Sequence, residues 1–311
     1  MKIKINIVDA GSRYGIHPNF EELREIADFH LFEVDKEECL RLKKKYKSYK
    51  NIKVYNQGLF SKKTKMNFNI RKHNALNSIY ETNNLFLKKN KYKKNEFEKK
   101  KSIKVKLDTL DNFFNKKIHF LKLDVEGAEL DVLKGSEKNL KNNCVGIRSE
   151  VTFSPVYKNA PLFSEINDYL VKRDFELINF DYDGKGSKFG KYSNTNKFGQ
   201  LITTDAVWVK KILKYNEKKI EKLFLISTFL FLNNCPDLAI ENLLIFVKKN
   251  KTSLKKYSRY PIVKFLRKKI LLLFKDFLNT PHFKDIDIFN DYKKLFGENF
   301  PRLHNFYQKK I

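Results

Sequence analysis

Cysteine, arginine and long apolar runs are all scarce in this sequence, and each shortage excludes a class of protein. The three cysteines, Cys39, Cys144 and Cys235, lie far apart and form no metal-binding pair, so we expect buried free thiols. The longest uncharged apolar run, LFLISTFLFL, is much shorter than the ~20 residues of a membrane-spanning helix. The first residues, MKIKINIVDAGSRYG, form a strand pattern and lack the apolar segment and cleavage site of a signal peptide. We therefore expect a cytoplasmic protein without a membrane span.

Acidic residues are outnumbered, because 64 lysines and arginines against 36 aspartates and glutamates give a formal net charge of +28. A charge of this size attracts nucleic acid, anionic glycans and anionic membranes alike. The cations are mostly lysines spread through every segment, whereas arginine is the better reader of bases and phosphates because of its planar fork. We therefore interpret the charge mainly as a solvated surface, with nucleic acid as the less favoured partner.

Strand and helix patterns alternate from residue 1 to about 210, which predicts a doubly wound α/β sheet. The expected strands are Ile3–Asp9, His30–Asp35, Lys53–Phe60, His119–Asp124, Val145–Val151, Phe175–Phe180 and Leu201–Val209. The expected helices are Phe20–Ala27, Lys36–Tyr46, Leu130–Asn139 and Phe163–Lys172. The last strand follows a stretch rich in Gly, Lys, Ser and Asn, so we expect an antiparallel edge strand. The run Lys88–Lys104 has almost no apolar periodicity, which predicts a surface loop or a frayed helix.

The pattern changes after about residue 210, which predicts a first domain over residues 1–210 and a helical extension over residues 211–311. Apolar residues recur at helical spacing in Asn216–Val247, and the break at Asn233–Pro236 predicts a helical hairpin. The segment Ile262–Leu278 has one apolar stripe and one basic side, which predicts an amphipathic helix. We expect the stripe to pack on the protein's own core. The alternative is peripheral contact with an anionic membrane at its inner face.

The first expected strand runs into the turn DAGSRYG, residues 9–15, at the place where open α/β sheets bind a cofactor. Gly11 lets the backbone approach a ligand without a Cβ in the way, and the glycine spacing is not the G-x-G-x-x-G of a pyrophosphate site. An aspartate at the end of the strand suits a cationic amino group better than a phosphate. Glu33, 22 positions after Gly11, ends the second strand and is placed to accept both hydroxyls of an adenosine ribose.

Five segments together resemble a known family. VDAGSRYG, FEVD, LDTLD, FLKLDVEGAELDVLKG and SEV are similar to the motifs of FkbM-type methyltransferases, over about residues 5 to 210. The resemblance implies a seven-strand Rossmann-like methyltransferase fold and S-adenosylmethionine as the cofactor. Ser12 and Arg13 depart from the commoner D-x-G-A-N-x-G turn, and FEVD replaces the commoner F-E-P. The expected cofactor site comprises Asp9, Gly11, Ser12, Gly15, Glu33 and Asp124.

The strand FLKLD and the turn after it hold more charge than a buried strand should carry without a use for it. In a sheet of this kind the strand lies beside the first one, so its end faces the sulfonium methyl group. Methyl transfer to a hydroxyl needs an acceptor held close and in line, and a base that takes its proton. We expect Asp124 as that base, then Glu126, with Glu150 as a third acid on the same rim. Asp124 and Glu150 could instead hold a divalent cation, which we do not favour.

The expected function is O-methylation of a sugar hydroxyl in a glycan or a lipid-linked saccharide, a substrate class that rests on the family alone. Asn77 and Ser78 are polar enough to grip such a sugar. A nucleic-acid methyltransferase is the alternative that the charge favours, but an N-P-P-Y-type motif and an obvious stacking platform are missing. A non-catalytic scaffold is a further alternative, against which the intact acids argue. The glycine spacing disfavours an NAD-dependent dehydrogenase.

Overall fold

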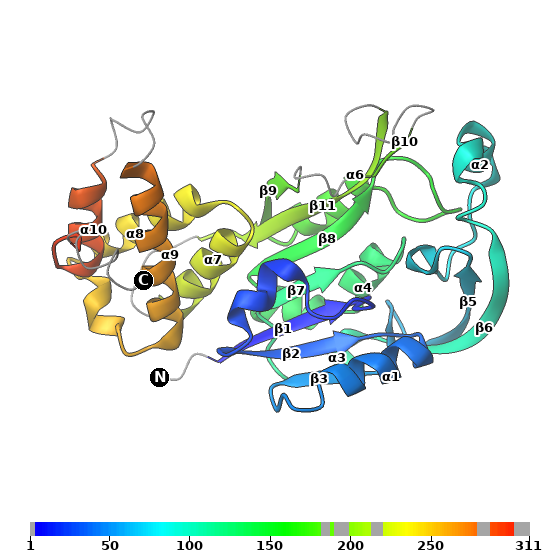
Figure 1. Cartoon of the computed structure of the whole chain (residues 1–311), viewed down its shortest axis with the longest axis horizontal. Coiled ribbons are helices and arrows are strands. Elements are labelled where there is room, and N and C mark those ends of the chain that lie inside the picture. The colour runs from blue at the N-terminus through cyan, green and yellow to red at the C-terminus, as the bar shows by residue number, and fades with distance from the viewer. Residues whose placement is uncertain (1–3, 182–186, 190–198, 213–219, 279–286, 302–311) are drawn as a thin grey trace, which may run out of the picture. The chain divides into compact units, whose positions relative to one another are not determined.

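The computed structural model describes residues 4–181, 187–189, 199–212, 220–278 and 287–301. These residues divide into two compact units, one within Lys4–Lys211 and the other within Ile212–Ile311 (Figure 1). The first unit is a mixed α/β structure, and the second is helical. Each unit is therefore described by itself.

The main sheet of the first unit has eight strands in the part of the chain that the structure describes. Their order is β10–β11–β8–β7–β1–β2–β3, and β9 also pairs with β11. The strands are β1 (Ile5–Ala10), β2 (Ala27–Phe32), β3 (Ile52–Tyr55), β7 (Phe120–Leu123), β8 (Gly146–Thr152), β9 (Phe175–Phe180), β10 (Ser187–Phe189) and β11 (Gln200–Lys210).

The strand order reverses at β1, which pairs in parallel with both β2 and β7. The chain builds β2 and β3 on one side of β1 and returns to build β7 and β8 on the other side. In a sheet wound in this way, the carboxyl ends of the strands next to the reversal diverge and leave room for a ligand. The expected doubly wound, Rossmann-like sheet is confirmed.

The expected antiparallel strand is also present, but it lies one place further inside the sheet than predicted. β11 pairs antiparallel with β8 on one side and with β9 and β10 on the other side, so β9 and β10 form the edge. Trp208 in β11 is completely buried, as is usual for an inner strand. The sequence pattern predicted the antiparallel direction of the last strand but not its position in the strand order, because that position depends on long-range pairing.

Helices connect these strands and cover the sheet: α1 (Lys36–Lys45), α3 (Leu110–Phe113), α4 (Glu129–Lys134), α5 (Glu137–Asn142) and α6 (Phe163–Val171). Asp35 caps α1, because its carboxylate accepts hydrogen bonds from the amides of Glu37 and Glu38. The main core joins apolar side chains of the helices and the sheet, among them Val8, Leu121, Val132, Ile147, Leu170 and Trp208.

Two predicted helices differ from the structure. The segment expected as Phe20–Ala27 is a short 3-10 helix, Pro18–Leu23, after which β2 already begins at Ala27, three residues before the expected strand. The helix expected at Leu130–Asn139 is broken between α4 and α5. At the break, a Cβ on Gly135 would lie 2.1 Å from the backbone oxygen of Phe60, so a close backbone approach interrupts an otherwise helical pattern.

A smaller sheet of β4 (Gly58–Leu59), β5 (Thr64–Arg71) and β6 (Lys99–Asp108) lies between β3 and β7 in the chain, with α2 (Asn84–Lys89) and the 3-10 helices η2 (Asn74–Leu76) and η3 (Lys91–Lys93). The prediction of a loop or frayed helix for Lys88–Lys104 is wrong in its last part, which belongs to β6. Residues 99–104 are exposed on both faces of the strand, so their sequence has no two-residue apolar period.

The second unit contains α7 (Ile220–Leu232), α8 (Pro236–Lys249), η6 (Leu254–Tyr257), α9 (Pro261–Leu278) and α10 (Ile288–Phe296). Helix α7 contacts both α8 and α9. In α9, Ile262, Leu266 and Ile270 are buried, so most of the apolar stripe is covered within the unit. None of the helices in the described ranges is long and apolar enough to cross a membrane.

Replacing Gly11 with alanine is expected to lower the free energy of unfolding by about 2–4 kcal/mol, the combined cost of backbone strain and overpacking. Gly11 has a φ of +78°, and a Cβ built on it would lie 1.7 Å from the backbone oxygen of Asp124. Urea denaturation measures the effect. Ser12→Ala is the matched control, because it removes only a hydroxyl hydrogen bond to the oxygen of Phe32 and should cost about 1 kcal/mol. Equal midpoints for Gly11→Ala and the wild type would contradict the close approach.

Candidate active site

A cavity of about 360 Å³ opens at the carboxyl ends of β1, β2, β7 and β8, where the strand order reverses. One wall comes from the glycine turn and from the residues after β2 and β3. The opposite wall comes from the segment after β5, from β8 and from the residues that follow β8. The cavity brings together five residues of the expected site: Gly11, Glu33, Asp124, Glu126 and Glu150.

The glycine turn is fixed between the ends of two strands. The amides of Gly11 and Ser12 donate to the backbone oxygen of Phe32 at 3.0 and 3.2 Å, and the amide of Asp124 donates to the oxygen of Ala10 at 3.0 Å. These bonds put the turn against β2 on one side and β7 on the other. The backbone of the turn is therefore rigid before any ligand binds.

Three residues of the expected cofactor site do not line the cavity in the described structure. Ser12 is buried and donates its hydroxyl to Phe32, and Gly15 lies against the hydroxyl of Tyr46. Asp9 is 2% exposed and faces Lys122 below the turn. The sequence pattern identified the turn, but of the four turn residues expected to bind the cofactor only Gly11 lines the cavity, where Ala10, Arg13 and Tyr14 join it.

Lys122 lies between two carboxylates, at 3.4 Å from Asp9 and 3.2 Å from Asp124. Asp9 and Lys122 are directly opposite each other in the pairing of β1 with β7. Burial raises the pKa of Asp9 to about 6, against the lowering effect of Lys122. Burial alone would lower the pKa of Lys122, but the charges of Asp124 and Asp9 outweigh it and raise this pKa above its usual range. The lysine therefore remains a cation in the core.

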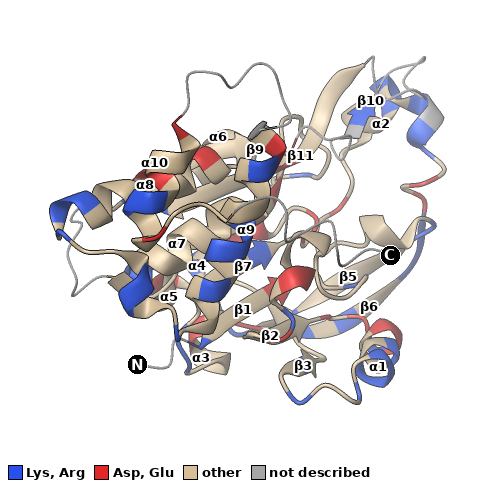
Figure 2. Cartoon of the chain, turned by 60° about the vertical axis from the view of Figure 1, so that its left-hand side comes forward, with Lys and Arg blue, Asp and Glu red and all other residues tan. Residues whose placement is uncertain are grey.

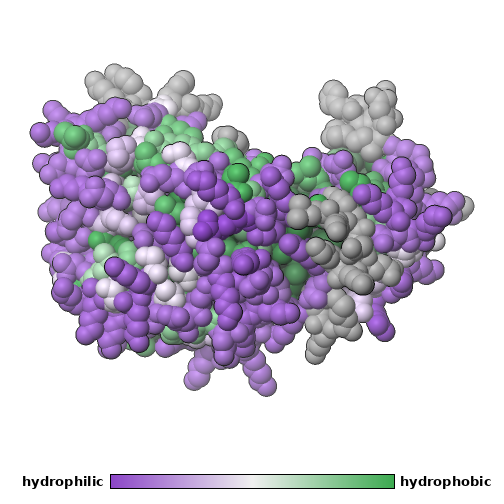
Figure 3. Space-filling model, turned by 180° about the vertical axis from the view of Figure 1, so that it is seen from behind, coloured by the Kyte–Doolittle hydropathy of each residue, from purple (hydrophilic) through white to green (hydrophobic). Residues whose placement is uncertain are grey.

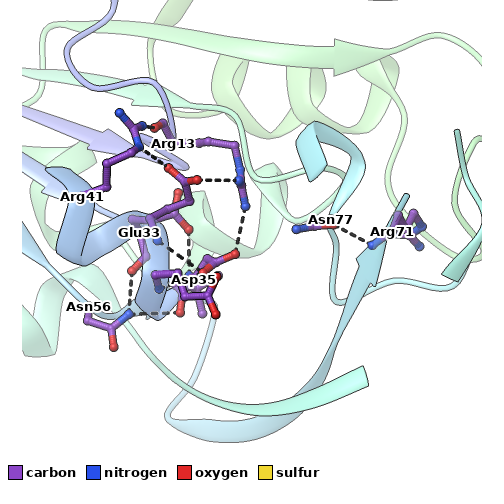
Figure 4. A network of polar contacts seen from close by, with 10 residues as sticks. Arg13, Glu33, Asp35, Arg41, Asn56, Arg71 and Asn77 are labelled. Carbon is purple, nitrogen blue, oxygen red and sulfur yellow. Dashed lines mark hydrogen bonds and ion pairs between the residues drawn. The ribbon is translucent and has the colours of Figure 1, made fainter. Parts of the chain in front are cut away.

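Glu33 directly follows β2 and points its carboxylate to the cavity, with a residue exposure of only 5%. One carboxylate oxygen accepts the amide of Asp35 at 2.8 Å (Figure 4). Burial raises the pKa of Glu33 to about 7, although the bond from Asp35 and the charge of Arg13 act in the opposite direction. A carboxylate that is fixed, buried and only singly bonded can accept hydroxyl groups of a ligand.

Two arginines hold the segments on either side of Glu33 together (Figure 4). Arg13 of the glycine turn pairs with Asp35 at 3.0 Å and with Glu38 at 3.3 Å. Arg41 of α1 pairs with Glu38 at 2.7 Å and donates to the backbone oxygen of Arg13 at 2.5 Å. Because Arg13 also lines the cavity, this network closes the cavity wall beside Glu33.

Three acids form a cluster on the opposite side of the cavity. One oxygen each of Asp124, Glu126 and Glu150 lies within 4.8 Å of the others, and all three side chains are partly buried. Burial and the neighbouring carboxylates raise the pKa of Glu126 and of Glu150 well above the usual range. At this spacing the cluster can share protons or hold a cation, for which oxygen ligands are suited.

The three acids differ in their partners. Asp124 is paired with Lys122, and Glu126 accepts the hydroxyl of Tyr157 at 2.6 Å. For the side chain of Glu150, no hydrogen-bond partner is found among the described residues. Glu150 is therefore the acid of the cluster with the freest oxygens.

Glu129, the fourth charge of the FLKLDVEGAEL segment, has a structural role. Its carboxylate accepts the amides of Val125 and Gly127 at 2.9 and 3.0 Å, and the residue is 3% exposed. These bonds stabilise a turn in which Glu126 has a φ of +54°. Glu129 thereby holds Glu126 in the orientation that faces the cavity.

The segment after β5 supplies polar groups whose arrangement only the structure shows. Arg71 is buried and donates to the backbone oxygens of Leu76 and Tyr80 at 2.5 and 2.7 Å. Its amide donates to Oδ1 of Asn77 at 2.7 Å, so the amide nitrogen of Asn77 is turned away, toward the side of Glu33 (Figure 4). Asn77 lines the cavity, is 7% exposed, and its Nδ2 is without a partner among the described atoms. This buried donor is therefore available to a ligand.

Ser78 links the same segment to the acid cluster, because its hydroxyl donates to the backbone oxygen of Glu126 at 2.6 Å. The sequence singled out Asn77 and Ser78 by their polarity alone. Ser78 proves to be a structural link, and Asn77 is the residue that reaches the cavity. Arg71 and Tyr157 carry no motif that reveals their positions.

The fold and the cavity define the class as a Rossmann-like methyltransferase. The family model of the methyltransferase FkbM domain matches residues 9–177, more than half of the 311 residues. The chain therefore belongs to the FkbM methyltransferase family, which confirms the resemblance of its motifs. A search of curated proteins found no match.

Similar solved structures include a methyltransferase FkbM from Methylobacillus flagellatus KT, at 11% identity and a TM-score of 0.40, over 66% of this chain and 44% of that one. An rRNA methylase from Streptococcus thermophilus is 12% identical, with a TM-score of 0.35 over 68% of this chain and 91% of that one. A dimethyladenosine transferase from Plasmodium falciparum is 11% identical, with a TM-score of 0.31 over 96% of this chain and 92% of that one. The chain thus spans less than half of the first structure, and scores this low give no argument about the substrate.

The free protein is expected to lose stability as pH rises from about 6 to 8, because acids with raised pKa values bind protons more tightly when folded than when unfolded. For Glu33, whose pKa is raised to about 7, this stabilisation is largest at low pH and is lost as pH rises through 7. Between these two pH values, Glu33 is expected to lower the free energy of unfolding by about 1.4 kcal/mol, the equivalent of one pKa unit. Urea denaturation of the wild type and of Glu33→Gln at both pH values measures it. An equal pH dependence in both proteins would contradict the raised pKa.

Proposed function

We propose that the protein is an S-adenosylmethionine-dependent O-methyltransferase that acts on a hydroxyl group of a saccharide. One observation carries the proposal: a single cavity holds a strand-end acid suited to a ribose, Glu33, opposite a cluster of three carboxylates suited to a hydroxyl acceptor. Membership of the FkbM family supports methyl transfer. The cofactor, the acceptor and the residue roles are proposed from the cavity.

The cofactor would occupy the side of the cavity formed by the glycine turn and β2. Glu33 would accept the ribose hydroxyls there, and the apolar side chains of Val34, Phe68 and Leu107 beside it suit a flat, apolar ring. Asp124 would stabilise the positive charge of the sulfonium, because a carboxylate attracts a cation. Gly11 leaves the space that the chain of the cofactor needs, since it has no Cβ.

Glu150 is better placed than Asp124 to take the proton of the acceptor, which changes the order expected from the sequence. Asp124 is paired with Lys122 at 3.2 Å, so one of its carboxylate oxygens is already occupied by a cation. Glu150 lacks such a partner, and its raised pKa gives it the greater affinity for a proton. A bound sulfonium lowers that pKa, because a positive charge favours the ionised form. Cofactor binding thereby prepares the base.

The remaining wall suits a sugar. Tyr157, Phe97 and Phe189 offer aromatic surface, the cluster offers carboxylate acceptors, and Asn77 offers an amide donor. Hydroxyl groups need acceptors and donors of this kind, and the C–H faces of a sugar ring need apolar surface. Since the amide of Asn77 is fixed by Arg71, it can orient the acceptor without rearrangement.

Glu33→Gln is expected to weaken binding of S-adenosylmethionine by about 2–3 kcal/mol at pH 8, because it removes charged acceptors of two hydroxyl groups. Calorimetry measures the affinity. In the wild type the affinity should rise with pH through about 7, since the ionised form of Glu33 is the better acceptor. Glu37→Gln, at an exposed acid of α1, is the control and should bind like the wild type. Equal affinities of Glu33→Gln and the control would refute the ribose site.

Glu150→Gln is expected to lower turnover by ~10²–10⁴, the usual effect of a lost general base, while cofactor affinity stays within about threefold of the wild type. Asp124→Asn should lower turnover less and should weaken the cofactor more. Transfer of labelled methyl groups from S-adenosylmethionine to a mixture of free and lipid-linked saccharides measures turnover. Full turnover of Glu150→Gln would place the base elsewhere. Loss of wild-type turnover on addition of a chelator would show that the cluster holds a divalent cation instead.

A further inference from the structure

A lysine-rich segment, residues 84–106, forms part of the rim of the cavity; it is called the lysine arm below. It comprises α2, η3 and most of β6 and contains ten lysines, two glutamates and no arginine. This net charge of +8 is more than a quarter of the +28 of the whole chain, on less than a tenth of its residues. Lysine is thus concentrated here, and Figure 2 shows it along α2 and the neighbouring strands.

Most of this charge is exposed and uncompensated. Lys93 pairs with Glu96 and Lys99 pairs with Glu81, but no acidic side chain of the described ranges pairs with Lys100, Lys101, Lys104 or Lys106, all of which are exposed. Lys106 lies directly opposite Lys65 in the pairing of β5 with β6. Like charges at opposite positions of a sheet destabilise it, so a negatively charged partner would stabilise this arrangement.

The lysine arm adjoins the cavity. Three residues of the lysine arm line the cavity: Lys93, Glu96 and Phe97. The inner wall of the cavity, by contrast, carries four acids, Glu33, Asp124, Glu126 and Glu150. A negative interior and a positive rim suit a ligand whose reacting end is neutral or cationic and whose surroundings are anionic. We therefore expect the lysine arm to contact the molecule or surface that carries the acceptor, and not the acceptor atom itself.

We infer that the lysine arm docks the protein on an anionic membrane surface, with the cavity mouth beside the lipid. Lysines near such a surface attract anionic headgroups, and apolar side chains enter the interface between them. Leu85, at the start of α2, is 73% exposed beside the lysines at positions 88 and 89. On the proposed contact, Leu85 would enter the lipid interface between the lysines and add an apolar contribution to their attraction.

Nucleic acid is the other polyanion to consider, and the lysine arm suits it less. Base and phosphate recognition favours arginine, of which this segment has none. Phe86 is buried at 6% exposure, and Phe97 faces the cavity at 4% exposure, so neither offers a stacking surface beside the exposed lysines. The docking surface also differs from the amphipathic helix α9 of the second unit, since the apolar residues Ile262, Leu266 and Ile270 of α9 are buried. Figure 3 shows hydrophilic and hydrophobic residues on one side of the molecule.

Flotation of the full chain with vesicles tests the inference, and it needs neither cofactor nor acceptor, so its outcome is independent of the proposed function. The vesicles contain phosphatidylcholine with or without phosphatidylglycerol, at low and high salt. The arm variant carries Lys→Glu at 100, 101, 104 and 106. The control variant carries Lys→Glu at the exposed positions 248, 255, 264 and 268, so both proteins have the same net charge. Circular dichroism and urea denaturation show that each variant is folded.

The wild type is expected to bind only the vesicles that contain phosphatidylglycerol, and to lose binding at high salt. The arm variant should bind at least about tenfold more weakly, since each lysine near the surface contributes, and the control variant should stay within about threefold of the wild type. Leu85→Ser should weaken binding without changing its dependence on salt. Equal losses in both charge variants, a loss in the control alone, or absent wild-type binding would overturn the inference. Tighter binding to single-stranded RNA than to the vesicles, lost in the arm variant, would assign the surface to nucleic acid.

Discussion

The buried lysine between β1 and β7 is the interaction on which the rest of the site depends. Lys122 neutralises Asp9 and Asp124 from two neighbouring strands, one within the core and one at its edge. Lys122 and Asp9 are both buried, and removing one partner of a buried pair leaves an uncompensated charge, which typically costs about 3–5 kcal/mol. The ion pairs therefore fix the ends of the two strands next to the reversal of strand order, and with them the glycine turn and the first acid of the cluster.

The four charges of FLKLDVEGAEL have three different uses, and together they position the acidic wall of the cavity. Lys122 and Asp124 form the ion pair, Glu129 holds the turn by its backbone amides, and Glu126 faces the cavity with Tyr157 as its partner. A buried strand can carry this load because each charge has a compensating group or reaches the cavity. The high positive charge of the chain and its acidic cavity are thus two separate features.

The first unit carries charges of opposite sign in two places, acids inside the cavity and lysines on its rim. Carboxylates line the inside of the cavity, where we propose that the cofactor and the acceptor bind, and exposed lysines occupy the rim. A methyltransferase that takes its acceptor from an anionic surface needs this division, because the same charges could not serve both ends of the substrate. The proposed membrane contact and the proposed chemistry therefore support each other physically, although they are tested separately.

The sequence by itself determined the class of sheet, the family and the acids at the strand ends. Alternating patterns and the strand–turn–acid order are local, so Gly11, Glu33, Asp124 and Glu150 could be chosen without coordinates. Only the tertiary structure decided which of these residues face the cavity and which support them. Lys122 and Asn77 acquire their roles from groups far away in the chain, and the inner position of β11 follows from pairing with β8. Burial and long-range pairing determine the pKa values of the acids and which hydrogen-bond donors are available to a ligand. A local sequence pattern shows neither the burial nor the pairing.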